Sequence, residues 1–156
     1  SQSEIEKATK IDVVSKSTDF EIEAVEALQI SSANDKIDNE EVDHFSITGS
    51  LSKVSIDDLY NSASISLKYG RIKIKRISKD VCSFMATTTR STLDLGFAND
   101  ANKTISGFSG DCEIQSMNPR IKVKSKMPTL KATVGNSESA NCTYQFSCTK
   151  GKLYFK

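Results

Sequence analysis

The stretch from Ile11 to Asp80 repeats itself with a period of about 18 residues, one fewer in the first two units. Aligning residues 11–27, 28–44, 45–62 and 63–80 produces five columns, in which Asn39 is the one polar member. The columns hold Ile11, Leu28, Phe45 and Ala63; Val13, Ile30, Ile47 and Ile65; Phe20, Ile37, Val54 and Ile72; Ile22, Asn39, Ile56 and Ile74; and Val25, Val42, Leu59 and Ile77. Self-similarity at a fixed period is typical of stacked repeats, in which a single unit cannot bury its own apolar face.

Within each unit, the apolar positions are paired at a spacing of two residues. This spacing puts both side chains on one face of a strand, with the intervening polar residue on the other face. Each unit therefore predicts two short strands joined by turns, and stacked units would form parallel ladders with a strand spacing of about 4.8 Å. The leucine-rich repeat is an alternative, but its spaced-Leu pattern is missing. An antiparallel sandwich would not require agreement column by column. The sequence favours an all-β, parallel β-solenoid.

The organisation we expect is one domain over residues 1–156, with a lead-in or cap at 1–10, regular coils at 11–80 and irregular C-terminal coils at 81–156. The period slips after Lys79, where Cys82 and Phe84 follow Ala63 and Ile65 by 19 residues. Leu93 and Leu95 follow Ile72 and Ile74 by 21 residues. Alternating apolar residues and turn residues predict further strands at 91–97, 104–108, 112–115, 121–124, 130–134, 142–148 and 153–155.

The formal net charge is +1, but the charge is unevenly distributed along the chain. Residues 1–60 hold 14 acidic and 5 basic side chains, and residues 61–156 hold 6 acidic and 16 basic ones. The repeat offset predicts ion pairs between stacked coils, Asp57 with Lys75 and Asp58 with Arg76, each worth about 0.2–1 kcal/mol. A dipolar molecule that stacks head to tail or binds a charged polymer is the alternative.

A basic surface is expected at Arg71, Lys73, Lys75 and Arg76. Binding of nucleic acid would require stacking aromatic residues beside it, and only Tyr69 is close. The near-neutral total charge also argues against nucleic acid as a partner.

Four cysteines, Cys82, Cys112, Cys142 and Cys148, follow the regular repeat. They permit two disulfides with three possible connectivities, or free buried thiols. The chain has no CxxC spacing and one histidine, His44, so neither a zinc site nor another cofactor is expected.

The sequence contains little that supports a catalytic function. His44 is expected at a solvated turn, away from any cysteine, which argues against a catalytic triad. An acidic surface is expected at Asp38, Glu40, Glu41 and Asp43 on one turn and at Asp57 and Asp58 one coil on. Adjacent coils could place two carboxylates at the separation that a glycosidase needs, or gather oxygens for calcium, but a solvated acidic face is the simpler interpretation. There is no apolar run long enough to span a membrane.

Three segments, 65–74 (ISLKYGRIKI), 92–114 (TLDLGFANDANKTISGFSGDCEI) and 144–155 (YQFSCTKGKLYF), resemble the family of bacterial adhesin-like proteins related to the auto-transporter adhesin head (GIN) domain. The closing run Thr149–Phe155 is similar to the strand, turn and strand with which such proteins end. The resemblance implies a right-handed β-helix, in agreement with the preference for right-handed parallel crossovers. It also implies export to the periplasm or cell surface, and no enzymatic activity.

From this resemblance we expect a non-catalytic, extracytoplasmic binding or structural module whose outward Ser, Thr, Lys and Asp ladders meet a surface glycan or a protein. The alternatives are a periplasmic envelope or regulatory scaffold and a carbohydrate-active β-helix enzyme. The ligand, the disulfide pairing and the oligomeric state stay open at this point.

Overall fold

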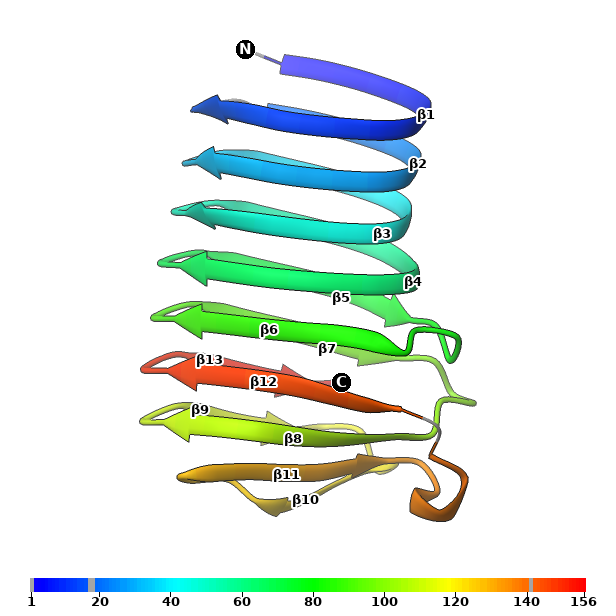
Figure 1. The fold of residues 1–156 in the computed structure, drawn as a ribbon, viewed down its shortest axis with the longest axis vertical. Coiled ribbons are helices and arrows are strands. Elements are labelled where there is room, and N and C mark those ends of the chain that lie inside the picture. Colours follow the sequence, from blue (N-terminus) through cyan, green and yellow to red (C-terminus); the bar gives the residue numbers. More distant parts are fainter. Residues whose placement is uncertain (1, 17–18, 141) are drawn as a thin grey trace.

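The computed structural model describes residues 2–16, 19–140 and 142–156, and most of these residues lie in strands. The strands wind into a right-handed parallel β-solenoid, as the sequence predicts (Figure 1). The elements are β1 (Gln2–Lys16), β2 (Asp19–Ala33), β3 (Lys36–Ser50), β4 (Lys53–Lys68), β5 (Arg71–Ile77), β6 (Ser83–Thr89), β7 (Thr92–Phe97), β8 (Lys103–Gly110), β9 (Glu113–Ser116), β10 (Ile121–Ser125), β11 (Thr129–Val134), the 3-10 helix η1 (Ser137–Ser139), β12 (Thr143–Thr149) and β13 (Lys152–Phe155).

The first four strands are long and bent, so that each contributes to two layers. In β2 the core-facing positions are Phe20, Ile22, Val25, Leu28 and Ile30, spaced by two, three, three and two residues. A spacing of three leaves two successive residues outside, which turns the strand through a corner without ending it. The first half of each long strand lies in a back sheet and the second half in a front sheet, which faces the viewer (Figure 1). In the first three units, one of the two expected turns is therefore a bend within a strand.

The register of the coils confirms the apolar columns. Val54 pairs in parallel with Ile37 on one side and Ile72 on the other. The segment expected as a lead-in is itself part of a coil, because Ile5 pairs with Ile22 along β1.

The 19-residue offset expected for Phe84 is wrong. Phe84 pairs with Ala63, 21 residues earlier, and not with Ile65. The loop between β5 and β6 takes up the two additional residues. The offset predicted for Leu93 and Leu95 is confirmed, since these residues pair with Ile72 and Ile74.

Within the described residues, two-residue turns follow β2, β3, β4, β6, β8 and β12, on the side opposite the bend. The first residue of each turn is exposed and has a φ between 50° and 59°, and the amide N–H of such residues bonds across to the next coil, as from Leu51 to the Lys68 carbonyl at 3.0 Å. Tyr69 occupies this position and is 56% exposed. The residues that share this conformation are Asn34, Leu51, Tyr69, Arg90, Lys150 and Asp111.

The C-terminal coil is inserted between two earlier coils instead of being stacked last. In the front sheet β12 pairs with β6 on one side and β8 on the other, and in the back sheet β13 lies between β7 and β9. The red strand between the green ones in Figure 1 shows this insertion. Beyond β8, the strands β11 and β10 continue the front sheet in antiparallel order. Between β7 and β8 the chain therefore leaves the position of one coil unoccupied, and β12 and β13 later occupy that position.

Both disulfides tie the inserted coil to its neighbours. Cys82 and Cys142, which precede β6 and β12, are joined, and so are Cys112, before β9, and Cys148, at the end of β12. Of the three connectivities that the sequence leaves open, this is the one that links adjacent strands on each side of the inserted coil.

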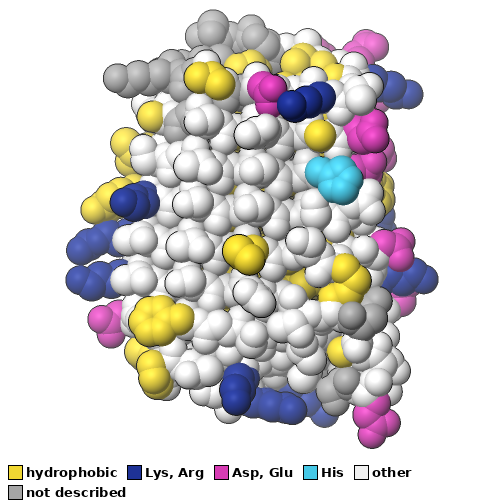
Figure 2. Space-filling model, viewed as in Figure 1, with side chains coloured by type: hydrophobic (Ala, Val, Ile, Leu, Met, Phe, Trp, Pro, Cys, Tyr) yellow, Lys and Arg dark blue, Asp and Glu magenta, His cyan; other side chains and the backbone are white. Residues whose placement is uncertain are grey.

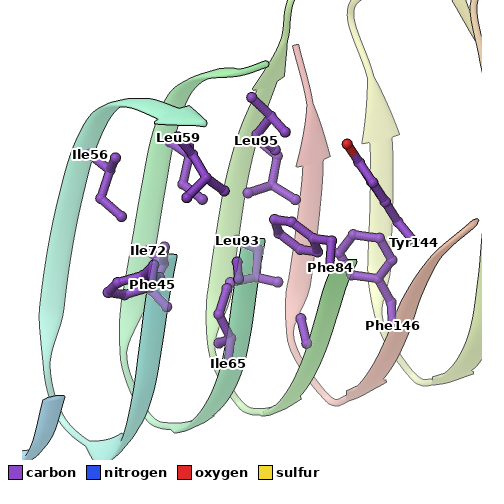
Figure 3. Close-up of a cluster of buried hydrophobic side chains, with 14 of the residues drawn as sticks. Phe45, Ile56, Leu59, Ile65, Ile72, Phe84, Leu93, Leu95, Tyr144 and Phe146 are labelled. Carbon is purple, nitrogen blue, oxygen red and sulfur yellow. The ribbon is translucent and has the colours of Figure 1, made fainter. Parts of the chain in front are cut away.

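Aromatic side chains fill the core where the coil is inserted. Phe84 stacks on Tyr144, with ring centroids 5.2 Å apart, and Phe146 meets Phe155 edge to face at 5.9 Å. Figure 3 shows Phe84, Tyr144 and Phe146 packed together beside the aliphatic columns. The Tyr144 hydroxyl donates a hydrogen bond of 2.7 Å to the Val81 carbonyl. Burial of the phenol raises the pKa of Tyr144 far above its usual value.

Asn39 is the one polar member of the aligned columns, and its side chain is 3% exposed between Ile22 and Ile56. Within the described residues, neither Nδ2 nor Oδ1 has a hydrogen-bond partner. An unpaired buried amide costs about 1–3 kcal/mol. We predict that Asn39→Ile raises the free energy of unfolding by about 2 kcal/mol, measured by urea denaturation. Asn39→Ala, which leaves a cavity, should gain less, and an unchanged midpoint for the isoleucine variant would contradict the prediction.

Candidate binding surfaces

The outer surface of the front sheet is uncharged over most of its height. From β2 to β8, two adjacent outward columns hold only hydroxyl, amide and apolar side chains. We call this surface the hydroxyl face; its members are Gln29, Ser31, Ser46, Thr48, Ser64, Ser66, Met85, Thr87, Gln145, Ser147, Ser106 and Phe108. Neighbours are about 4.8 Å apart across strands and about 6.7 Å apart along them. Figure 2 shows this face, largely free of the charged side chains that lie along its edges.

The lower half of the hydroxyl face contains a shallow depression of about 380 Å³. Met85, Gln145 and Ser106 line it, on three neighbouring strands. Met85 is 54% exposed and Phe108, one column away, is 50% exposed, so both present apolar surface beside hydrogen-bonding groups. Apolar surface next to a few placed polar groups is the usual composition of a ligand site.

The sequence pointed to outward Ser and Thr ladders in general, but it did not identify the hydroxyl face. The alternation of residues such as Ser46 and Ser64 with core residues is visible in the repeat. Its extension to Gln145 and Ser106 is not, because β12 comes next to β6 only through the insertion.

The acidic residues predicted on one turn instead lie on strand β3, with two more on β4. Asp38, Glu40 and Asp57 line one shallow groove of about 400 Å³ on the back sheet. The outward residues Glu4, Glu6, Glu21 and Glu23 of β1 and β2 line it too, so the groove lies between two columns of carboxylates. In Figure 2 some acidic side chains are visible along the right edge of the molecule.

The other three acidic residues lie outside this groove. Glu41 pairs in register with Asp58, and Asp43 is at the bend of β3. Burial, together with the charges of Asp58 and Glu41, raises the pKa of Tyr60. Burial is the largest cause of this shift, and the two nearby carboxylates add to it because they disfavour the phenolate.

The predicted basic residues lie on β5, where two of them meet the acidic surface. Lys75 Nζ is 3.3 Å from Asp57 Oδ1, and Arg76 Nε donates a hydrogen bond of 2.7 Å to Asp58 Oδ1. Both predicted ion pairs are confirmed. Arg71 lies 3.6 Å from Asp94 of β7, whereas Lys73 is exposed. The basic strand therefore partly neutralises the acidic coils above it.

His44 lies on strand β3, not in a turn, and its Nδ1 is 2.8 Å from the Ser62 hydroxyl. A nucleophilic Ser–His pair needs a third group to orient the ring. In the ranges that the structure describes, no carboxylate is hydrogen-bonded to His44, and no group of three or more His, Cys, Asp or Glu side chains is arranged to hold a metal ion.

Lys103 is fully buried at the start of β8, a feature that the sequence does not reveal. Its Nζ donates a hydrogen bond of 2.6 Å to the Lys79 carbonyl and lies 5.9 Å from the centre of the Tyr144 ring. Burial lowers the pKa of Lys103, and the charge of Asp80 opposes this shift. The ammonium group thus holds together the loop that precedes β6 and the inserted coil.

Comparisons with protein-family models, with curated proteins and with solved structures find no match for this chain. Kinship with the adhesin-like family stays a prediction. A search of the described residues finds no helix with the length and apolarity needed to cross a membrane.

Proposed function

We propose that this chain is a non-catalytic, extracytoplasmic binding module that recognises an extended, uncharged glycan with its hydroxyl face. The observation that carries the proposal is the run of outward columns, from Gln29 down to Phe108, in which no side chain has a formal charge. Elsewhere on the molecule charged residues are frequent, so their exclusion from this face requires a reason.

Sugar polymers fit the chemistry of this face. A pyranose ring has hydroxyl groups around its rim and C–H groups on its faces. The rim can exchange hydrogen bonds with Gln145, Ser106 and neighbouring hydroxyls, and the C–H surface can pack on Phe108 and Met85. Single hydrogen bonds contribute only about 0.5–1.5 kcal/mol. A polymer that lies across several strands would sum many such contacts, since linked sites bind with high effective concentration.

The two disulfides support a location outside the cytoplasm. Disulfides persist in secreted and periplasmic proteins, whereas cytoplasmic reductants keep thiols reduced. Both pairs anchor the inserted coil, which supplies Gln145 and Ser147 to the hydroxyl face. An oxidising compartment would therefore preserve the binding surface as well as the fold.

A glycan array followed by titration calorimetry tests the proposal. We predict that the protein binds neutral polysaccharides, and that Phe108→Ala weakens this binding about tenfold by removing an exposed aromatic surface. Tyr69→Ala is the matched control, because Tyr69 is 56% exposed but lies on the turn edge. Ser64→Glu should also abolish binding, since it places a charge in the centre of the face.

Other results would overturn the proposal. Binding that survives both Phe108→Ala and Ser64→Glu would exclude the hydroxyl face as the site. Release of reducing sugar that disappears in Asp57→Ala and Asp58→Ala would instead support a carbohydrate-active enzyme. Constant co-purification with one envelope protein, with no response on the array, would favour an envelope scaffold.

A further inference from the structure

The C-terminal end of the solenoid is strongly basic and has a composition unlike the rest of the chain. Residues 114–137 contain no Asp or Glu and five basic side chains. Arg120 is engaged in the fold, donating hydrogen bonds to the carbonyls of Ala98 and Ala101. The other four are exposed on or beside β10 and β11, and we call them the tip lysines: Lys122, Lys124, Lys126 and Lys131.

The tip lysines differ from many other basic residues of the chain because they have no acidic partner. Lys75, Lys79 and Lys152 each form an ion pair, whereas none of the tip lysines does so within the described residues. Figure 2 shows Lys and Arg side chains gathered at the lower end of the molecule, over β10 and β11. The full charge at this end is therefore available to a ligand.

Apolar side chains are exposed at the same end. Met117 is 78% exposed and Met127 is 54% exposed. Met117, Pro119 and Val123 line a shallow depression of about 500 Å³ together with Lys126. Flexible, polarisable methionine side chains adapt to irregular apolar partners, and an exposed apolar patch ringed by charge is typical of an interaction site.

Charge also varies systematically along the solenoid axis. Because β1–β4 stack in chain order, the charge of −9 in residues 1–60 lies at the N-terminal end, while residues 61–156 carry +10. An anionic surface attracts the basic end and repels the acidic one. Such a field orients the molecule before contact.

We propose that the tip docks on an anionic lipid bilayer, with the tip lysines at the phosphate level and Met117 and Met127 inserted among the headgroups. One observation favours a bilayer over nucleic acid, and a second shows that edge protection alone does not explain the tip. Binding of single strands would use aromatic platforms, and the exposed apolar side chains proposed to make contact, Met117 and Met127, are not aromatic. Edge protection explains lysines on the edge strand β10, but it does not explain two exposed methionines beside them. The hydroxyl face runs parallel to the axis, so a docked tip would leave it accessible; this inference does not depend on the proposed glycan binding.

Co-sedimentation with phospholipid vesicles tests the inference on the full chain. The protein is expected to bind vesicles that contain phosphatidylglycerol and not vesicles of phosphatidylcholine alone, and to be released by salt as the charges are screened. Each lysine near an anionic surface contributes about fivefold in affinity. The triple variant Lys122→Gln, Lys124→Gln, Lys126→Gln should therefore bind about a hundredfold more weakly.

The matched control is a triple variant of three exposed lysines away from the tip, which changes the net charge by the same amount as the tip variant. Its substitutions are Lys36→Gln, Lys53→Gln and Lys68→Gln. It should retain vesicle binding. Met117→Ser should weaken binding to vesicles about fivefold by removing apolar insertion, yet leave the affinity for dextran sulfate, a soluble polyanion, unchanged.

Three results would overturn the inference. The first is equal binding to phosphatidylcholine vesicles, and the second is equal loss in the control triple. The third is a Met117→Ser variant that binds vesicles as the unmodified chain does, because the tip would then be a site for polyanions in general. Thermal unfolding at an unchanged temperature shows that these surface variants remain folded, so that any loss of binding reports on the tip.

Discussion

Replacing Cys112 and Cys148 by alanine is expected to lower the free energy of unfolding by about 4 kcal/mol. Their disulfide spans 36 residues, and a loop of this length loses much of its entropy in the cross-linked unfolded chain. Replacing Cys82 and Cys142, which are 60 residues apart, should cost a similar amount, about 4 kcal/mol. Urea denaturation of each double variant gives the values. Each loss is a large share of the roughly 5–15 kcal/mol typical of a folded domain.

The loss should be concentrated in the inserted coil. β12 and β13 are held between strands that are distant in sequence, so without covalent links they can detach while the consecutive coils β2–β4 stay paired. Hydrogen exchange should therefore show early loss of protection in β12 and β13, with β3 still protected. Reductant should lower the denaturation midpoint of the unmodified chain and leave a variant without cysteines unchanged. Equal protection in β12 and β3 after removal of both disulfides would contradict this account.

Gly107→Ala is expected to lower the free energy of unfolding by about 4 kcal/mol. Gly107 lies on β8 opposite Phe146 of the inserted strand and has a φ of 155°, a backbone conformation that favours glycine. A Cβ added there would collide with the Phe146 carbonyl oxygen, so β8 and β12 could not keep their present separation. For a chain of this size, the unfolding temperature should fall by about 10 °C.

Gly110→Ala provides the control for this substitution. Gly110 is on the same strand, but the nearest atoms to its added Cβ belong to the Phe108 ring, at 3.0 Å, and this side chain can move. Its unfolding temperature should change by no more than a few degrees. If both variants unfolded at the temperature of the unmodified chain, the close packing of β12 against Gly107 would be wrong.

The hydroxyl face and the tip place two kinds of recognition on different parts of one solenoid. The face depends on Gln145 and Ser147 of the inserted strand, and the tip on the antiparallel pair β10 and β11. Variants that detach the inserted coil should therefore disturb glycan binding more than vesicle binding. The cysteine variants offer this comparison directly.

The repeat by itself determined the coil, because stacking at a nearly constant offset is a local property of the chain. Once Ile37, Val54 and Ile72 recur at the repeat spacing, their superposition follows, and so do the ion pairs of Asp57 with Lys75 and Asp58 with Arg76. Even the 21-residue offset between Ile72 and Leu93 could be predicted from the sequence, because Leu93 continues the same apolar column.

Only the tertiary structure decided where the last strands go. β12 is far along the chain from both of its neighbours, β6 and β8, and no recurring spacing connects these segments. The insertion depends on the coil position left unoccupied between β7 and β8, on the aromatic side chains that pack there and on the disulfides that link the inserted coil to its neighbours. Such pairings bring together residues distant in sequence, and their stability depends on the whole packed core. The cysteine pairing, the continuous hydroxyl face and the position of the basic segment at the end of the solenoid therefore become visible only in three dimensions.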